Sequence, residues 1–283
     1  MAETVGVIER GHVAVITGGA SGIGLAVAES VIERGMQVVL ADIDEPKLRD
    51  VEARLTESGA EVSGVICDTT DEASVEALAE ATIERFGAAH LVFNNAGIYG
   101  AGDAWADDIS LCRRVVDVNL FGVVHGIRAF LPIMTEQGVG HIVNTASMAG
   151  LMALPGAGPY NATKHAVVAI SEGLFLELGG LGSPVGVSVL CPGFVKTDLM
   201  SKEHVDSPSA TTPPTGQMAS LMGQLIADGV ETGVAANDVA QAVVDAVDSG
   251  RFWILTHEDM RQIPVERMQR AAAQINPSST GAD

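Results

Sequence analysis

The sequence is poor in cysteine and shows no residue spacing typical of a metal site. Its three cysteines, Cys67, Cys112 and Cys191, are an odd number, lie far apart and fall in or beside apolar stretches. This pattern argues against a disulfide framework and favours buried, reduced thiols, so we predict a cytoplasmic protein. The seven histidines show no metal-ligand spacing either, and we predict no bound metal.

Positive charge is also scarce. Only 16 Lys and Arg stand against 36 Asp and Glu, which gives a formal net charge of −20. Nucleic-acid phosphate and anionic membranes repel such a chain, so we predict neither as a partner. Disorder is excluded because 47% of the residues are hydrophobic and only 18% are charged. We expect the acidic excess on outer helix faces, for example at Asp44, Glu45, Glu52, Glu57, Asp71, Glu72, Glu76 and Glu80.

Long apolar runs and internal repeats are absent from the sequence. The N-terminal stretch MAETVGVIERGHV is acidic where a signal peptide is basic, and it has no apolar core. No window approaches the roughly 20 apolar residues that a membrane helix needs. Without a linker, we predict one domain over residues 1–283, with a core at about 12–256 and a C-terminal extension at 257–283.

Short β-branched runs alternate with longer amphipathic stretches along almost the whole chain. This alternation predicts an α/β fold, a single-domain Rossmann-type doubly wound parallel sheet of about seven strands with helices on both faces. The predicted strands are 13–17, 37–42, 62–67, 90–94, 141–145, 185–190 and 252–255. The predicted helices are 22–34, 45–58, 72–86, 107–136, 160–179 and 236–249.

Two segments depart from this alternation. Residues 200–218 are rich in Ser, Thr and Pro and follow the sixth strand, so we predict a substrate lid over about 198–232, with a passive surface loop as the alternative. After Pro264, apolar residues recur at helical spacing. They predict a terminal helix that packs on its own subunit or on a neighbour, or else frays.

A glycine-rich turn follows the first strand and leads directly into a helix. Its sequence is Thr17-Gly18-Gly19-Ala20-Ser21-Gly22-Ile23-Gly24. Glycines let the backbone turn sharply and approach a ligand, and the helix N-terminus offers free N–H groups to a pyrophosphate. We therefore predict a dinucleotide site that includes Gly18, Ser21, Gly22, Ile23 and Gly24; a tight strand-to-helix turn is the simpler reading.

Carboxylates end the second and third strands. Asp42, followed by Ile43, lies where it can accept hydrogen bonds from the adenosine ribose and repel a 2′-phosphate, which predicts NAD rather than NADP. Asp68, followed by Thr69, could reach the adenine amino group or could equally cap the next helix.

Three polar residues form the predicted catalytic group. Tyr160 and Lys164 are four residues apart and share one face of a helix, and Ser147 ends the fifth strand. A tyrosine has a pKa of about 10 unless a cation favours the phenolate. Lys164 is expected to lower that pKa, and Ser147 to hydrogen-bond the substrate oxygen.

With these motifs in order, the sequence resembles the short-chain dehydrogenase/reductase family in its compact single-domain form, over residues 12 to about 256. The resemblance also rests on Asn94-Asn95-Ala96-Gly97, on Asn119 and on Pro192-Gly193. It implies that Asn119 kinks its helix and holds a proton-relaying water, as a fourth catalytic residue. It further implies cofactor contacts for Asn95, Ala96, Gly97, Tyr160, Lys164, Pro192, Gly193, Val195 and Thr197. Read singly, these residues could be turn caps, solvated helix positions or strand terminators.

The family resemblance implies hydride transfer between an alcohol and NAD, with Tyr160 as the acid/base. The predicted substrate pocket is apolar and lacks Lys and Arg, which favours an uncharged secondary alcohol or ketone of aryl, terpenoid or steroid type. Two segments, residues 140–147 and 189–193, are similar to those of bacterial family members that act on aryl alcohols. The predicted pocket residues are Ile98, Tyr99, Met148, Ala149, Leu154, Phe194, Leu199 and Met200.

Two other functions remain open at this point. One is a non-catalytic NAD-binding sensor or scaffold, against which the complete Ser147, Tyr160 and Lys164 set argues. The other is a nucleotide-sugar epimerase or dehydratase, which shares the Tyr-x-x-x-Lys pair but normally has a longer C-terminal domain, whereas 27 residues follow Thr256 here. The long helices at 107–136 and 160–179 predict a homo-oligomer, either a dimer or a tetramer.

Overall fold

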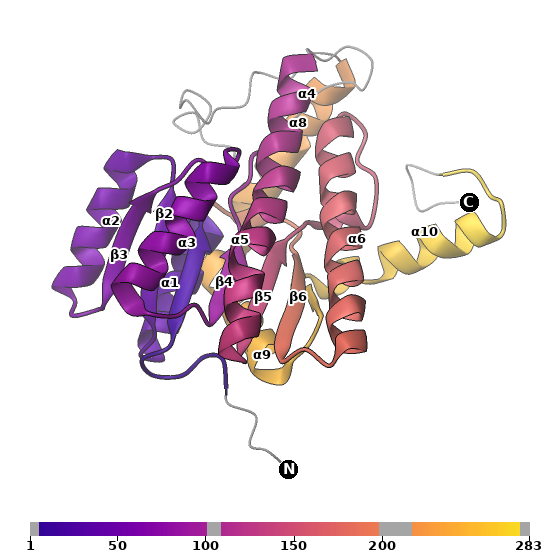
Figure 1. Ribbon diagram of the computed structural model, residues 1–283. Coiled ribbons are helices and arrows are strands. Elements are labelled where there is room, and N and C mark those ends of the chain that lie inside the picture. Colours follow the sequence, from indigo (N-terminus) through magenta and orange to yellow (C-terminus); the bar gives the residue numbers. More distant parts are fainter. Residues whose placement is uncertain (1–5, 101–108, 198–216, 278–283) are drawn as a thin grey trace.

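Seven parallel strands form the central sheet of the protein. The computed structural model describes residues 6–100, 109–197 and 217–277 (Figure 1). The strand order is β3-β2-β1-β4-β5-β6-β9, and every neighbouring pair is parallel. The order reverses between β1 and β4, which is the point at which doubly wound sheets bind their ligands. The predicted fold class is therefore confirmed.

The strands match the predicted runs to within one residue at either end. The sheet strands are β1 Val13–Thr17, β2 Gln37–Asp42, β3 Val62–Ile66, β4 Leu91–Asn94, β5 Gly140–Thr145, β6 Val185–Cys191 and β9 Trp253–Leu255. Two further strands, β7 Val195–Lys196 and β8 Val234–Ala235, pair with each other outside the sheet. Sequence periodicity could not predict them, because two residues show no alternation.

Helices cover both faces of the sheet (Figure 1). They are α1 Gly22–Glu33, α2 Glu45–Glu57, α3 Glu72–Phe86, α4 Ile109–Val116, α5 Gly122–Gln137, α6 Gly158–Leu181, α8 Gln217–Thr232, α9 Ala236–Ser249 and α10 Gln262–Ala272. Side chains alternate along each strand, so β1 sends Ala14 and Ile16 to one core, with α1, α2 and α9, and Val13 and Val15 to the other, with α3, α5 and α6. These two cores hold the strand ends in fixed positions.

The segment predicted as a lid includes a regular helix. Residues 217–232, which we predicted as its second half, form the regular helix α8, and Ile226 of this helix is buried. Residues 198–216 lie outside the described residues. Helix α10 begins at Gln262, two residues before the predicted start at Pro264, and it extends from the body of the molecule with none of its residues buried (Figure 1).

The helical run from α4 to α5 agrees with one expectation and departs from another. A π-helical turn, Asp117–Phe121, interrupts it at Asn119, as the family resemblance implied. Contrary to our expectation, this run of 29 residues is long and apolar enough to cross a membrane by length and composition. Val, Leu, Ile and Phe make it apolar on average, although charged residues interrupt the apolar run. Phe130 and Met134 are nevertheless buried in the core against the sheet, which is the packing of a core helix.

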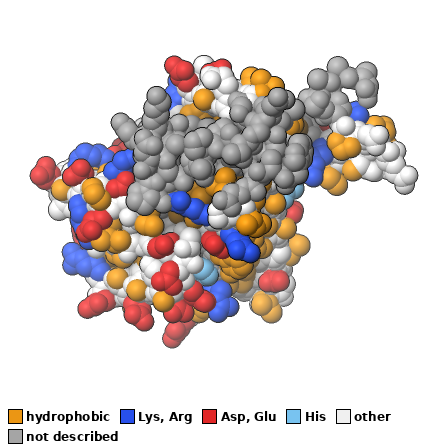
Figure 2. All heavy atoms as spheres, turned by 90° about the horizontal axis from the view of Figure 1, so that it is seen from above, with side chains coloured by type: hydrophobic (Ala, Val, Ile, Leu, Met, Phe, Trp, Pro, Cys, Tyr) orange, Lys and Arg blue, Asp and Glu red, His pale blue; other side chains and the backbone are white. Residues whose placement is uncertain are grey.

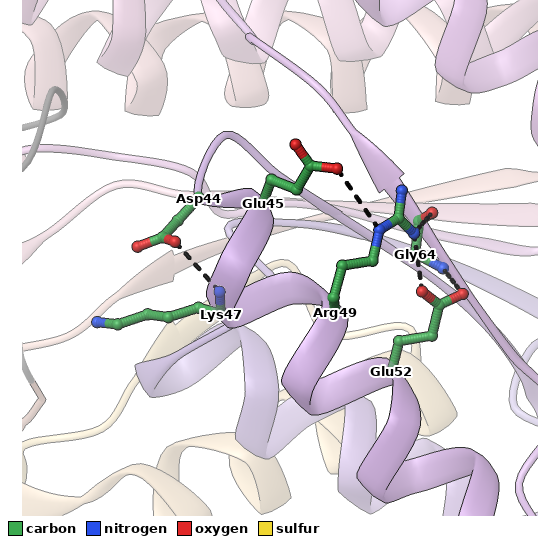
Figure 3. Close-up of polar contacts among 6 residues, drawn as sticks. All are labelled: Asp44, Glu45, Lys47, Arg49, Glu52 and Gly64. Atoms are coloured by element: carbon green, nitrogen blue, oxygen red, sulfur yellow. Dashed lines mark hydrogen bonds and ion pairs between the residues drawn. The ribbon is translucent and has the colours of Figure 1, made fainter.

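Helix α2 covers the edge strand β3. Glu52 Oε1 accepts a hydrogen bond from the backbone N–H of Gly64 at 2.7 Å, and Arg49 donates to the carbonyl of Gly64 at 2.9 Å (Figure 3). Arg49 also pairs with Glu45 and Glu52. These contacts satisfy edge groups that would otherwise be free to pair with another strand.

The acidic excess lies mainly on the outer faces of the helices, as predicted. Glu45, Glu57, Asp71, Glu72, Glu76 and Glu80 are exposed. Figure 2, a view down onto the carboxyl ends of the strands, shows Asp and Glu side chains spread around the periphery of this face. Asp44 and Glu52 are the exceptions, because both are partly buried: Asp44 accepts from Lys47 N and Glu52 accepts from Gly64 N.

His141 is a buried histidine in β5, within a polar chain that the sequence did not reveal. Its Nε2 lies 2.7 Å from Ser188 Oγ, and Ser188 in turn donates to the carbonyl of Arg251 at 2.7 Å. Because the Ser188 hydroxyl proton is donated to the Arg251 carbonyl, Nε2 of His141 must carry a proton and donate it to Ser188 Oγ. Burial lowers the pKa of His141 to about 4.

This pKa predicts acid sensitivity. Above about pH 6.5 the ring of His141 is neutral in both the folded and the unfolded chain. Between roughly pH 6.5 and 4 the ring takes up a proton in the unfolded chain but stays neutral in the folded chain, so the stability of the fold falls as the pH falls. We expect His141→Gln to melt at least about 3 °C below the wild type at pH 7, the shift that roughly 1 kcal/mol causes. The difference in melting temperature between His141→Gln and the wild type should become smaller toward pH 4. A gap that is independent of pH would contradict the assignment.

Candidate active site

A cavity of about 640 Å³ opens at the carboxyl ends of the sheet strands. Residues at or just after the ends of β1 to β6 line it, which is where parallel α/β sheets bind ligands. All predicted cofactor and catalytic residues line this cavity except Gly24 and Asn119, which lie behind its wall. Leu199 and Met200 fall outside the described residues. The structure thus brings together in one site residues that lie more than 170 positions apart in the sequence, such as Gly18 and Thr197.

The glycine-rich turn shapes one side of the cavity. Gly18 and Gly22 have left-handed backbones, with φ of +63° and +53°, which side chains disfavour. A Cβ on Gly24 would overlap the carbonyl of Gly18. Ser21, the N-cap of α1, makes no side-chain hydrogen bond to the helix. The uncapped N–H groups of α1 are therefore available to a phosphate, which fits a dinucleotide in this cavity.

Asp42 is fixed on the cavity wall by two backbone amides. Its Oδ2 accepts from Ala20 N at 3.1 Å and its Oδ1 accepts from Asp44 N at 3.0 Å. Asp44 caps α2 by accepting from Lys47 N at 3.2 Å (Figure 3). The carboxylate of Asp42 thereby links the glycine-rich turn to the start of α2, and it presents a negative charge to this end of the cavity.

Asp68 does not cap the following helix. Its Oδ1 accepts from the backbone and the hydroxyl of Thr70, at 3.0 and 2.8 Å, and so closes a turn. Asp71 is the N-cap of α3 and accepts from Ala73 N at 3.2 Å. The capping alternative for Asp68 is therefore wrong, and Asp68 lies with Thr69 on the cavity wall.

Thr17 organises the turn after β4, a role that the sequence analysis did not identify. Its Oγ1 accepts from Asn95 N at 2.9 Å and from Ala96 N at 3.1 Å. Asn95 Nδ2 donates back to the carbonyl of Thr17 at 3.1 Å. These bonds lock the ends of β1 and β4 together. A threonine at the end of β1, beside a strand ending in Asn-Asn, is the signal that could have indicated this contact.

Asn119 is fully buried in the π-helical turn. Its Oδ1 accepts from Ile98 N at 2.8 Å, and its Nδ2 donates to Ile98 O at 2.9 Å. The amide thus satisfies both backbone groups of Ile98, in the segment that follows Gly97. A Cβ built on Gly97 would lie 3.2 Å from Asn119 Oδ1 and 3.7 Å from Lys164 Nζ. Asn119 therefore supports the cavity floor beside Lys164.

Ser147 and Tyr160 lie close together on the wall of the cavity. Ser147 begins the short 3₁₀ helix Met148–Gly150 and accepts from Ala149 N at 3.1 Å. Burial raises the pKa of Tyr160, and its hydrogen bond with Ser147 opposes that rise. The expected net lowering of this pKa by Lys164 is therefore not met in the protein alone.

Lys164 lies below this pair and is 4% exposed. Its ammonium donates to the carbonyl of Thr145 at 2.9 Å and lies 5.7 Å from the centre of the Tyr160 ring. Burial lowers the pKa of Lys164 to about 8. The cation is thus held by the end of β5 rather than bonded to the phenol, and it can exchange its proton near neutral pH.

The comparisons with known proteins agree with this geometry. A family model described as short chain dehydrogenase matches residues 12–207. A short chain dehydrogenase/reductase from Burkholderia phymatum, whose structure is in complex with NAD, superposes with a TM-score of 0.91 at 41% identity, covering 97% of this chain and 99% of that one. The chain belongs to the short-chain dehydrogenase/reductase family.

Two curated relatives of this short-chain dehydrogenase are similar over most of their length. A "CLA biosynthesis dehydrogenase/reductase" from Lactiplantibacillus plantarum is 36% identical, over 90% of this chain and 91% of the relative. A "1-deoxy-11-beta-hydroxypentalenate dehydrogenase" from Streptomyces exfoliatus is 38% identical, over 88% and 84%. Both names describe oxidoreductases, and the protein is an oxidoreductase of this type.

The remaining part of the cavity is largely apolar. Tyr99 packs edge-on against Tyr160, with ring centroids 5.1 Å apart. Ile226 and Val230 of α8, together with Met152 and Met260, line this part and were missed by sequence reasoning, because no local motif marks them. The expectation that the pocket lacks Lys and Arg is wrong for the cavity as a whole. Lys47, Arg113 and Arg114 line it, from α2 and α4.

Proposed function

We propose that this short-chain dehydrogenase uses NAD to interconvert apolar, uncharged secondary alcohols and their ketones. The observation that carries this proposal is the position of Ser147, Tyr160 and Lys164, which line one continuous cavity with both the nucleotide-type turn and the apolar wall. A reacting oxygen between Ser147 and Tyr160 would therefore be close to both a bound cofactor and an apolar substrate body.

Each of the three residues has a separate chemical task in the oxidation. Tyr160 removes the hydroxyl proton, and Ser147 donates a hydrogen bond to the same oxygen. Lys164 stabilises the phenolate by its charge and passes a proton on, and Asn119 keeps the adjoining floor in place. NAD, when bound, would accept the hydride that leaves the carbinol carbon. Reduction of the ketone uses the same groups in reverse.

A screen for NADH formation tests this proposal. Aryl, terpenoid, steroid and aliphatic secondary alcohols are offered with NAD, and we expect turnover with apolar members of the panel. The hydroxypentalenate dehydrogenase name of the S. exfoliatus relative supports including polycyclic alcohols. Tight NAD binding without any turnover would favour the sensor or scaffold alternative. Turnover only of nucleotide sugars would favour the epimerase or dehydratase.

The preference for NAD rests on Asp42. Its charge is held in place by Ala20 N and Asp44 N, and a 2′-phosphate at this end would meet like charge. We expect kcat/KM to favour NADH over NADPH in the wild type. In Asp42→Asn we expect that preference to fall by about 10-fold to 100-fold, since a like-charge contact near a surface costs a few kcal/mol.

Lys47 gives this test a matched control. Because Lys47 lines the same cavity, Lys47→Ala removes a cation that would assist a 2′-phosphate, and the NADH preference should rise. The measurement is the ratio of kcat/KM for the two cofactors in all three proteins. A wild type that prefers NADPH would overturn the assignment.

We also propose a symmetric homo-oligomer, a dimer or a tetramer, in the cytosol. Large apolar side chains are exposed on the helices of one face: Ile109, Phe121, Phe175, Leu176 and Leu181. Exposed apolar side chains on neighbouring helices support burial against another copy. Two of the cysteines, Cys67 and Cys191, are buried free thiols, which supports a reducing compartment.

A further inference from the structure

One wall of the cavity is held by a histidine from the C-terminal part of the chain. His257 follows β9 and lies 64 positions after Gly193 in the sequence. Gly193 N donates to His257 Nδ1 at 3.1 Å, and His257 Nε2 lies 3.0 Å from the carbonyl oxygen of Phe194. One imidazole therefore bonds two consecutive residues of the segment after β6.

The partners of the two ring nitrogens indicate the tautomer of this ring. A backbone N–H only donates, so Nδ1 accepts and carries no proton. A carbonyl only accepts, so Nε2 carries the proton and donates to Phe194. Both nitrogens are used in the neutral ring, and Thr256 Oγ1, at 2.9 Å from Nδ1, adds a second contact to that nitrogen. This neutral tautomer is the form that can make both backbone bonds.

The segment Pro192–Phe194 is joined on its other sides to Met148, the residue after the catalytic serine, and to β8. Met148 N donates to Pro192 O at 2.9 Å, directly after Ser147. Val234 N donates to Phe194 O at 3.0 Å. His257 completes these attachments from the third side. A displacement of this segment would therefore also displace the turn that carries Ser147.

Gly193 is shaped to receive the histidine. A Cβ at this position would lie 2.9 Å from carbon atoms of the His257 ring and 2.7 Å from Met260 Sδ. Real Cβ atoms do not approach that closely, so the absence of a side chain at Gly193 lets the imidazole pack against the backbone. The strand-terminator reading of Pro192-Gly193 does not account for this fit.

We propose that His257 is a positioning residue of the active site, which sets the place of Gly193 and Phe194 through two backbone hydrogen bonds. The segment after β9 then helps to shape the active site, and Met260 of this segment lines the cavity. This inference rests on the proposed function only for its kinetic consequence. The structural consequence, protection of the Gly193 amide, holds in the protein without any cofactor.

The test compares three variants with the wild type. His257→Phe keeps the ring shape but removes both hydrogen bonds. His257→Gln keeps one acceptor and one donor. His12→Phe is the matched control, because His12 Nδ1 bonds a backbone carbonyl, that of Val7, at 3.0 Å, at the opposite end of the sheet.

The first readout is amide hydrogen exchange in the protein alone. In His257→Phe, exchange across the peptide that contains Gly193 should be at least about 10-fold faster, as expected for the loss of one or two net hydrogen bonds. His257→Gln should restore most of the protection, and His12→Phe should leave this peptide at the wild-type rate. Equal protection in His257→Phe and the wild type would overturn the proposal.

The second readout is calorimetric NADH affinity together with steady-state kinetics. His257→Phe should raise Kd for NADH and lower kcat by about 10-fold each, with partial recovery in His257→Gln, whereas His12→Phe should change neither. A lower melting temperature with unchanged Kd and kcat would reduce His257 to a purely structural residue and contradict the proposal. A wild type that binds no NADH would instead contradict the proposed function, while the exchange result would still test His257.

Discussion

Replacing Tyr160 with Phe is expected to lower kcat for alcohol oxidation by about 100-fold to 10,000-fold, the range that general acid–base groups contribute. The variant keeps the ring that lines the cavity and loses only the hydroxyl that bonds Ser147. NADH affinity should therefore stay within a few-fold of the wild type. Calorimetry for binding and initial rates for turnover separate the two effects.

The neighbouring phenol provides a matched comparison. Tyr99 lies 5.1 Å from Tyr160 between ring centroids, and its buried hydroxyl has no hydrogen-bond partner in the part of the chain that the structure describes. Burial raises its pKa, so the hydroxyl stays protonated. Tyr99→Phe should reduce kcat far less than Tyr160→Phe. Equal losses in the two variants would show that the hydroxyl of Tyr160 has no special role.

Replacing Lys164 with Met is expected to have the second largest effect. Lys164 is the buried cation nearest to the Tyr160 ring, and burial already raises the pKa of that phenol. Without the ammonium, the phenolate loses its compensating charge, and the backbone oxygen of Thr145 loses its donor. We expect kcat/KM for oxidation to fall by at least about 100-fold.

The pH profile distinguishes this role from simple structural damage. Oxidation requires the phenolate, so its rate should rise with pH in the wild type. The rise should move to higher pH in Lys164→Met, because the charge that favours the phenolate is gone. Lys164→Arg keeps a cation and should keep the wild-type position of the rise, although its longer side chain lowers the rate. A profile in Lys164→Met that overlays the wild type would contradict the role.

The sequence predicted those parts of the molecule that local patterns encode. Buried strands appear as apolar runs, and their ends carry the glycine-rich turn, Asp42, Asp68 and Ser147, so topology alone brings these residues to one edge. Tyr160 and Lys164 are a helical pair at a spacing of four. For these residues, local sequence and position in the sheet are enough to place them on the cavity.

The missed features depend on contacts between distant segments. His257 is recognisable only when β9 places it against Gly193, and Thr17 only when β4 lies beside β1. The sequence does not predict helix α8, because the Ser, Thr and Pro residues before it favour a loop. The direction of the pKa shift of Tyr160 likewise depends on the folded environment. Spacing indicates that Lys164 is near, but burial and the bond to Thr145 O determine its net effect.

Hydride transfer itself is the most direct test of the proposed function. An alcohol identified in the NADH screen is prepared with deuterium at the carbinol carbon and incubated with NAD and the wild-type protein, and the NADH is examined by mass spectrometry. We predict one deuterium per NADH formed, and almost no NADH with Tyr160→Phe. NADH without deuterium, or equal yields from the two proteins, would contradict direct transfer assisted by Tyr160.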